Sequence, residues 1–283
     1  MDGIIDVGGG LRDIYGAGVF DRLMDDGITF KYCIGVSAGS ANVASYIAGQ
    51  KGRNYKFYTE YPLHKEYMSL KNLIRKRAYL DLDYVYGVLS NTGGLNPLDY
   101  EKFSEYAGEF RVVATDAYTG KAKYFDRHNI SKDNYDILKA SSCLPVVCPP
   151  YRIGEGEYYD GGLSDPVPLD KAFEDGCDRV VLILTKPIVP MLINRIDLAG
   201  ARVLERKFPK FAEAMRAHND RYNKAVEVAL KLQAEGKVLI ICPDDVGGVG
   251  TLTKDRIKLD ALYKKGYADG GRIKEFLSAR AAG

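Results

Sequence analysis

Ser37 stands between two glycines in the segment GVSAG, residues 35–39, directly after the apolar run KYCIGV. The pattern Gly-x-Ser-x-Gly is typical of a nucleophilic serine at a sharp turn between a strand and a helix, because glycines relieve the crowding there. The residues that follow predict a helix over 38–50, whose first N–H groups would face a developing anion at the serine. The segment indicates nucleophilic serine chemistry. The competing interpretation is a Gly/Ser-rich loop that packs a helix close to a sheet.

A second glycine cluster, Gly8 to Gly10, also follows an apolar run and precedes a predicted helix. A dinucleotide-binding fingerprint would need glycine where the chain has Asp13, and a phosphate-binding P-loop would need a Gly-Lys-Ser/Thr sequence that this segment lacks. The remaining interpretation is an oxyanion loop, whose backbone N–H groups stabilise the negative oxygen of a reacting carbonyl. Two such glycine segments within the first forty residues favour this interpretation.

A nucleophilic serine needs a proton acceptor, and the chain has three histidines, His64, His128 and His218. Only His218 lies late enough for the order serine, acid, histidine. It falls in a stripe of helical spacing, however, which is more typical of packing than of catalysis. The alternative acceptor is Asp160 in EYYDGG, where burial at a strand end would raise the carboxyl pKa toward a range useful to a base. The competing interpretation of Asp160 is a turn aspartate that bonds its own backbone.

Apolar runs and helix-period segments alternate along the chain and must position these residues. Near-continuous Val/Ile/Leu/Cys runs, typical of parallel strands buried on both faces, occupy 3–7, 31–36, 110–115, 178–185 and 236–242. Helical patterns occupy 14–26, 38–50, 98–108, 168–176 and roughly 210–235. Two hairpins are predicted, one with its turn near residues 119–120 and one with its turn at 154–156. The alternation predicts an α/β fold with a mostly parallel central sheet and helices on both faces.

Residues 51–97 differ from the rest because they are dense in tyrosine and carry a basic cluster, Lys71, Arg75, Lys76 and Arg77. We expect one domain over 1–195, with 51–97 as a cap or insertion, and a helical C-terminal extension over 196–283 that packs on the same domain. Tyrosine rings beside lysine and arginine suit the edge of a bilayer. Ordinary half-buried packing of the tyrosines is the competing interpretation.

The composition narrows the class of protein. The 283 residues are 46% hydrophobic and 28% charged, which suffices for a sizeable core. The net charge of +2 lacks the basic excess typical of nucleic-acid binders, so we expect no nucleic-acid partner. Five scattered cysteines indicate a reducing compartment, and the start of the chain lacks the pattern of a signal peptide. We therefore expect a cytoplasmic protein; its oligomeric state is not predicted.

The segments GGGLR, GVSAG and YYDGG, in this order, resemble the patatin-like phospholipases over roughly residues 2–190. The segments VVATDAYTGKAKYF, KASSCLPVVCPPY and DPVPLDKAFEDG are similar to the family's intervening segments. The resemblance, which is strongest to the compact bacterial-type cytosolic branch, implies a three-layer α/β/α fold. It also implies a lipid acyl hydrolase, of phospholipase A or carboxylesterase type, with a Ser-Asp dyad, no histidine, no metal and no cofactor.

By this resemblance Ser37 is the nucleophile and Asp160 the base. The oxyanion hole comprises the loop Gly8, Gly9, Gly10, Leu11 and Arg12 and the N–H of Ala38. The family usually has glycine after the arginine, whereas this chain has Asp13, which either caps the helix 14–26 or places a negative charge near the oxyanion. Arg12 either braces the loop or meets a lipid phosphate.

The implied partner is an acyl lipid or another ester, with transient contact to a membrane surface. Three alternatives stay open at this point. The same dyad serves an acyltransferase or a thioesterase, and a chain with Asp13 could bind lipid without turning it over.

Overall fold

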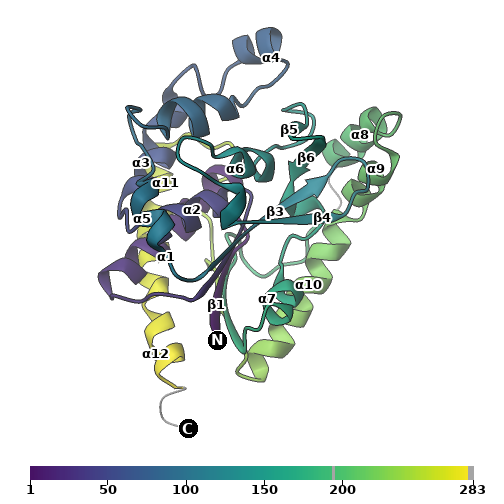
Figure 1. The fold of residues 1–283 in the computed structure, drawn as a ribbon. Helices are drawn as coiled ribbons and strands as arrows, with labels where there is room; N and C mark the ends of the chain where they lie inside the picture. The colour runs from purple at the N-terminus through teal and green to yellow at the C-terminus, as the bar shows by residue number, and fades with distance from the viewer. Residues whose placement is uncertain (193–194, 280–283) are drawn as a thin grey trace.

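The computed structural model describes residues 1–192 and 195–279, with only the backbone at Lys76. Its centre is an eight-stranded sheet in the order β5-β6-β3-β2-β1-β7-β8, with β4 paired to β3 (Figure 1). The strands are β1 Asp2–Asp6, β2 Tyr32–Val36, β3 Glu109–Asp116, β4 Ala122–Asp126, β5 Tyr151–Ile153, β6 Gly156–Asp160, β7 Arg179–Ile183 and β8 Val238–Ile241. The neighbouring strands β3, β2, β1, β7 and β8 are parallel to one another. Strands β4 and β6 pair antiparallel with β3, and β5 pairs antiparallel with β6. The predicted mostly parallel sheet and both predicted hairpins are confirmed.

Both faces of the sheet are buried, which explains why its strands read as continuous apolar runs. Along β1, Ile4 points into one hydrophobic core and Ile5 into the other. Cys33 and Ile34 divide in the same way along β2. Because successive side chains of a strand point to opposite faces, each strand serves two cores at once.

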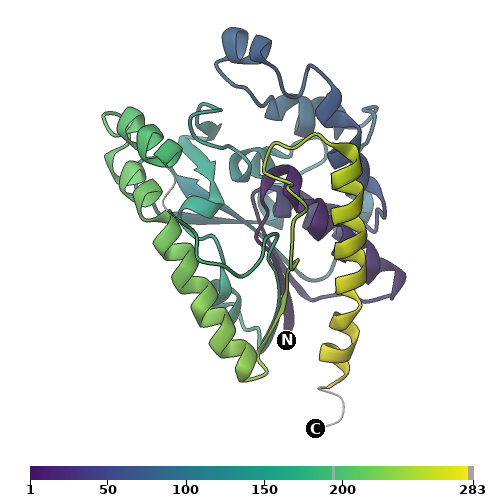
Figure 2. The same ribbon diagram turned by 180° about the vertical axis from the view of Figure 1, so that it is seen from behind.

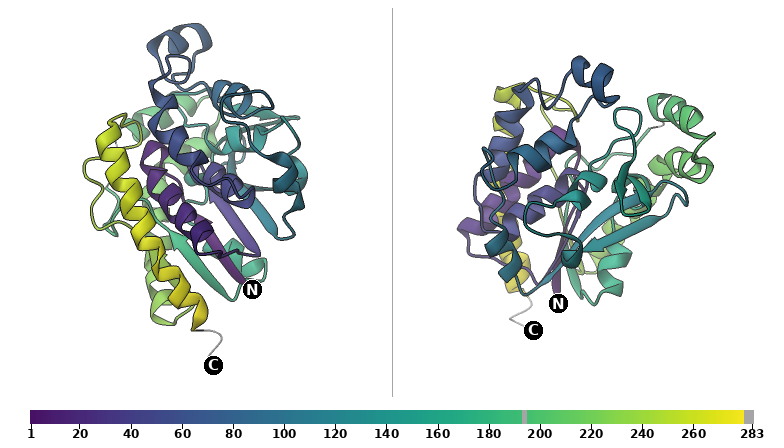
Figure 3. Two further views of the ribbon diagram at one scale, coloured as in Figure 1. Left: turned by 90° about the vertical axis from the view of Figure 1, so that its left-hand side faces the viewer. Right: turned by 45° about the horizontal axis from the view of Figure 1, so that its top comes forward.

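Helices cover the two faces as separate layers (Figure 2 and the right-hand view of Figure 3). One face carries α1 Ile14–Asp25, α2 Ala38–Ile47 and α11 Arg256–Gly270, and the other carries α7 Leu169–Glu174 and α10 His218–Ala234. Further helices are α5 Tyr100–Glu105, α6 Asp136–Ser141, α8 Arg195–Leu204, α9 Pro209–Arg216 and α12 Arg272–Ser278. This three-layer arrangement confirms the predicted fold class.

The helix predicted over roughly 210–235 is two helices, α9 and α10, which meet at Ala217. The helix predicted over 98–108 is shorter, because Asp99 caps its start by accepting from the Lys102 N–H at 3.1 Å.

Residues 51–97 form α3 Arg53–Thr59, α4 Leu70–Lys76 and short helical turns at Tyr61–Leu63 and Tyr84–Leu89. In Figures 1 and 3, α4 projects at the end of the molecule where the parallel strands terminate, opposite the N-terminus. Within the described residues no helix combines the length and the apolar character needed to cross a bilayer.

The C-terminal part contributes β8 to one edge of the sheet and α11 to the layer that contains α1. The last four residues of the predicted extension lie outside the described residues.

Candidate active site

Ser37 occupies the bend between β2 and α2 with φ +55° and ψ −132°. Positive φ is costly for a residue with a Cβ, so the surrounding structure must hold this conformation. The flanking glycines allow the bend: a Cβ at Gly35 would lie 2.4 Å from the Ser40 Cα, and one at Gly39 would lie 2.5 Å from the Asp6 carbonyl oxygen. Helix α2 therefore starts in direct contact with β1 and β2, and Ser37 is left at the apex.

Asp160 ends β6 and meets Ser37, although the two residues are 123 positions apart in sequence. The Ser37 hydroxyl donates to Asp160 Oδ2 at 2.5 Å, and the Gly162 N–H donates to Asp160 Oδ1 at 2.9 Å. Burial raises the pKa of Asp160 to about 6, and these two hydrogen bonds oppose the rise. The Asp160 side chain therefore accepts one hydrogen bond from the backbone of its own turn and one from the Ser37 hydroxyl.

Two hydroxyl side chains that the sequence analysis missed hold this pair in place. Ser141 Oγ accepts the Ser37 N–H at 2.8 Å and donates to the Val113 carbonyl at 2.6 Å. Thr115 Oγ1 donates to the Asp160 carbonyl at 2.7 Å. Ser141 lies inside KASSCLPVVCPPY, the segment similar to the family, but nothing in its local pattern distinguishes it from Ser142.

The glycine loop lies against the serine bend, with φ of +72°, +143° and +59° at Gly8, Gly9 and Gly10. Two of its N–H groups already have acceptors. The Gly8 N–H donates to Asp6 Oδ1 at 3.0 Å, and the Leu11 N–H donates to the Thr251 carbonyl at 2.8 Å.

These bonds exclude the N–H groups of Gly8 and Leu11 as free oxyanion donors in this conformation. Within the described residues the N–H groups of Gly9, Gly10 and Ala38 have no acceptor. Of the predicted oxyanion residues, these three offer unoccupied backbone donors beside Ser37. The Arg12 side chain contacts the segment after β7, since its Nε donates to Thr185 Oγ1 at 3.4 Å, and it also lines a cavity at this site.

Asp13 precedes α1 as its N-cap residue, but its side chain caps nothing. Its carboxyl is fully buried and accepts no hydrogen bond from the described residues. Burial, and after it the neighbouring Asp6, raise the pKa of Asp13 well above its usual range. Burial also raises the pKa of Asp6 to about 6. The expectation that Asp13 serves as a helix-capping side chain is wrong, and burial favours an uncharged Asp13 over the negative charge considered for the oxyanion.

Two cavities meet at Ser37 and share Gly10, Leu144 and Thr251 as walls. The first is mostly apolar and extends beneath the 51–97 segment, with walls that include Ala41, Phe57, Leu82, Val85, Leu98 and Leu138. The second also holds Asp160 and is called the polar cavity because charged and polar side chains line it, among them Arg12, Lys186, His218 and Tyr222.

His218 does not join the pair, although it lines the polar cavity. Its Nδ1 is buried without a partner among the described residues, and burial lowers its pKa. Among the described residues no hydrogen bond joins its ring directly to Ser37 or Asp160. His64 bonds the Tyr84 hydroxyl at 2.7 Å, and His128 lies in a turn after β4.

Comparison with known proteins gives two family matches. The model of the patatin-like phospholipase family matches residues 7–173, and the model of a domain of unknown function, DUF6363, matches residues 208–279. The uncharacterized protein YjjU of Escherichia coli strain K12 is 30% identical over 186 residues, which are 64% of this chain and 50% of YjjU. The chain thus spans about half the length of this relative.

Among solved structures, VipD from Legionella pneumophila superposes with a TM-score of 0.49 and 14% identity, over 96% of this chain and 66% of VipD. The family model matches more than half of the chain and includes both the glycine loop and Ser37 and Asp160. The protein belongs to the patatin-like phospholipase family.

Proposed function

We propose that this protein is a serine lipid acyl hydrolase of phospholipase A or carboxylesterase type, with Ser37 as nucleophile and Asp160 as base. The observation that supports this most directly is the hydrogen bond from Ser37 Oγ to the buried Asp160 carboxylate. A buried carboxylate with a pKa near 6 is ionised at neutral pH, yet basic enough to accept a proton from an attacking hydroxyl.

The reaction follows from this geometry. Asp160 takes the Ser37 proton while Oγ attacks the ester carbonyl, and the N–H groups of Gly9, Gly10 and Ala38 stabilise the oxyanion. Asp160 then returns the proton to the departing alcohol, which leaves an acyl-serine. Asp160 then deprotonates a water that attacks this ester, and it returns that proton to Ser37 Oγ as the bond to the acyl group breaks and the carboxylic acid departs.

The apolar cavity is the proposed acyl-chain pocket, because it opens at Ser37 and buries apolar side chains along its length. Arg53 also lines it, but its guanidinium donates to Ser45 Oγ at 2.7 Å, Ser90 Oγ at 3.1 Å and the Asn96 carbonyl at 3.1 Å. The Arg53 donors are therefore satisfied by neutral acceptors and do not require an anionic ligand.

Transient membrane contact is the proposed route to substrate. On α4, Leu70 is 70% exposed and Ile74 is 82% exposed, beside exposed Lys71 and Arg75. An apolar surface with basic neighbours is the composition that favours the interface of an anionic bilayer.

Labelling with a fluorophosphonate probe tests the proposed nucleophile. We expect the wild-type protein to form a covalent adduct and Ser37→Ala to form none. Ser104→Ala, at an exposed serine on α5, is the matched control and should label like wild type.

Absence of labelling in the folded wild-type protein would contradict the hydrolase and favour lipid binding without turnover. If labelling occurs, mass spectrometry of the products of a lipid and thioester panel separates hydrolysis from acyl transfer and thioester cleavage.

A further inference from the structure

The polar cavity beside Ser37 carries two cationic side chains from different elements. Arg12 comes from the loop after β1, and Lys186 follows β7. Both are half-buried, and neither forms an ion pair with any described residue. Burying two cations in one cavity without an anion is unfavourable, because each loses hydration and repels the other.

Lys186 is held at the wall by an aromatic ring rather than by an acid. Its Nζ lies 3.9 Å from the centroid of the Tyr222 ring. Burial, and after it the positive charge of Arg12, lower the pKa of Lys186 to about 8. An anion between the two cations would relieve both effects.

The acids near this cavity do not supply that anion. Asp160 is the carboxylate among the cavity-lining residues of the described chain, and its two oxygens accept from Ser37 and Gly162. Asp13, next to Arg12 in sequence, is buried with a raised pKa that favours its uncharged form. His218 also lines this cavity, and its Nδ1 is buried without a partner among the described residues.

We propose that Lys186, with Arg12 and the α10 residues Tyr222 and His218, forms a subsite for a phosphate group on the alcohol portion of the substrate. The subsite rests on the proposed hydrolase function. The acyl chain occupies the apolar cavity, the ester carbonyl lies at Ser37 where the two cavities meet, and the alcohol with its phosphate enters the polar cavity.

A phosphate matches this donor set better than a neutral head group does. Guanidinium and ammonium groups form charge-assisted hydrogen bonds to phosphate oxygens, and several oxygens can be contacted at once. A neutral diglyceride would leave both cations without a counter-charge.

This subsite assigns a role to the C-terminal segment whose family is described as a domain of unknown function. Tyr222 and His218 lie within residues 208–279, and Tyr222 holds Lys186 in the cavity wall. The segment would thus select the leaving group, whereas the patatin-like part supplies the bond-breaking residues.

The test compares two substrates with identical acyl chains, dioctanoyl phosphatidic acid and dioctanoylglycerol. We expect Lys186→Met to lower the ratio of kcat/KM for the first over the second by roughly tenfold or more, because a charge-assisted contact is lost. Lys186→Arg keeps the charge and should retain most of the ratio. Lys224→Met, an exposed lysine on the same helix as Tyr222, removes an equal charge outside the cavity and should leave the ratio unchanged.

Calorimetric titration with inorganic phosphate tests the subsite without catalysis. We expect binding to wild type and to Lys224→Met, and loss of binding in folded Lys186→Met. If wild type cleaves neither lipid, the fluorophosphonate labelling decides the hydrolase proposal separately and this titration alone decides the subsite. Equal phosphate binding by wild type and Lys186→Met would overturn the proposal. Binding that depends on Lys186 with an unchanged substrate ratio would assign the site to free phosphate and overturn the head-group assignment.

Discussion

At the scale of single residues, the environment of Asp160 predicts a pH dependence of activity. Its pKa is raised to about 6, so the carboxyl is protonated below that pH and cannot accept the Ser37 proton. We expect kcat/KM on a soluble ester to rise tenfold per pH unit below pH 6 and to level off above it. Asp160→Asn should lower kcat roughly 100-fold to 10,000-fold across the whole range.

A titrating histidine could also make kcat/KM rise with pH near pH 6, so His218→Gln is the necessary comparison. This rise is called the acidic limb of the pH profile. We expect the limb near pH 6 to persist in this variant, because the limb belongs to Asp160. Disappearance of the limb in His218→Gln, with substantial activity left in Asp160→Asn, would contradict the dyad and indicate a triad.

The buried Asp13 carboxyl should make the stability of the protein, rather than its rate of catalysis, depend on pH. Its folded-state pKa is raised above the ordinary value of 3.8, so its folded form holds a proton that the unfolded chain releases. The stability associated with this proton is present at low pH and is lost as pH rises toward the folded pKa. Asp13→Asn cannot release that proton, so we expect its Tm to exceed that of wild type increasingly from pH 4 to pH 8.

The largest expected gain in the free energy of unfolding of Asp13→Asn over wild type is about 1.4 kcal/mol for each unit by which folding raises the pKa of Asp13. Thermal denaturation at several pH values measures it. A constant difference between the two Tm curves would contradict the buried, protonated Asp13.

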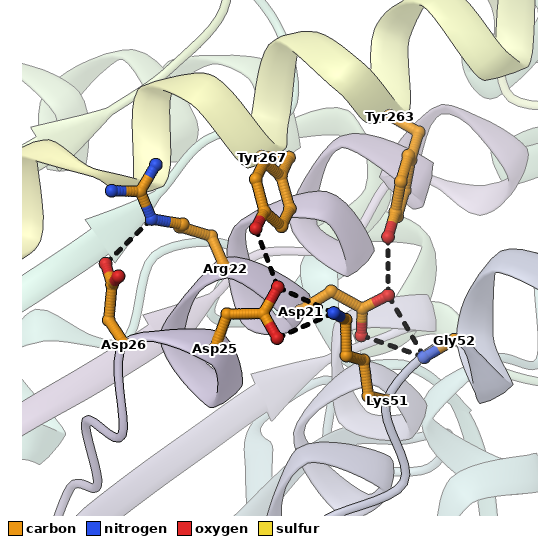
Figure 4. A network of polar contacts seen from close by, with 8 residues as sticks. All are labelled: Asp21, Arg22, Asp25, Asp26, Lys51, Gly52, Tyr263 and Tyr267. Carbon is orange, nitrogen blue, oxygen red and sulfur yellow. Dashed lines mark hydrogen bonds and ion pairs between the residues drawn. The ribbon is translucent and has the colours of Figure 1, made fainter.

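At the scale of elements, the C-terminal helix α11 is held against α1 by direct backbone contact and by a polar network. Tyr263 donates to Asp21 Oδ2 at 2.6 Å, and Tyr267 donates to Asp25 Oδ2 at 2.6 Å (Figure 4). A Cβ at Gly266 would lie 2.0 Å from the Tyr15 carbonyl oxygen, so α11 and α1 can approach this closely only because Gly266 has no side chain.

Gly266→Ala tests this packing, since alanine favours an isolated helix by about 1 kcal/mol over glycine. We expect the opposite sign here, with a loss of about 1–3 kcal/mol, because the new methyl group forces the helices apart. The matched control is Gly87→Ala, in a helical turn where a Cβ would meet nothing within 4 Å, and it should leave Tm unchanged or slightly raised. Equal Tm values for the two variants in thermal denaturation would contradict this account of the contact.

At the scale of the whole molecule, exposed apolar side chains gather on α4 and around α8. In Figures 1 and 3 these helices lie at the end where the parallel strands terminate, which is the end that carries Ser37. The most exposed of these side chains are Leu70, Ile74, Leu192, Ile196 and Val203. The arrangement would place the openings of both cavities toward a lipid surface.

Vesicle sedimentation tests this orientation. We expect Ile74→Asp, which adds a negative charge to the proposed contact face, to weaken binding to anionic vesicles several-fold. Leu230 is near the C-terminal end of α10, which runs away from α8 and α9 in Figure 1, so Leu230→Asp makes the same chemical change and should bind like wild type. Equal binding of the two variants would contradict membrane contact through α4.

The amino-acid sequence by itself determined the elements and the local shape of the site. Strand and helix periodicity predicted the strands, both hairpins and the bend at Ser37, because each depends on residues within a few positions of one another. Gly35 is required by a local contact with Ser40, whereas Gly39 is required by Asp6 on the neighbouring strand β1. The catalytic roles of Ser37 and Asp160 stay predictions, which the resemblance and the geometry support.

Only the tertiary structure decided which donors are free and which charges are paired. The Leu11 N–H donates to the carbonyl of Thr251, 240 positions later, and Lys186, which follows β7, packs against the Tyr222 ring of helix α10. Burial, and after it the neighbouring Asp6, raise the pKa of Asp13 and favour its uncharged form, whereas its local pattern predicted a helix cap. Periodicity specifies which face of an element is buried, but the identity of the atoms packed against that face depends on how distant elements come together.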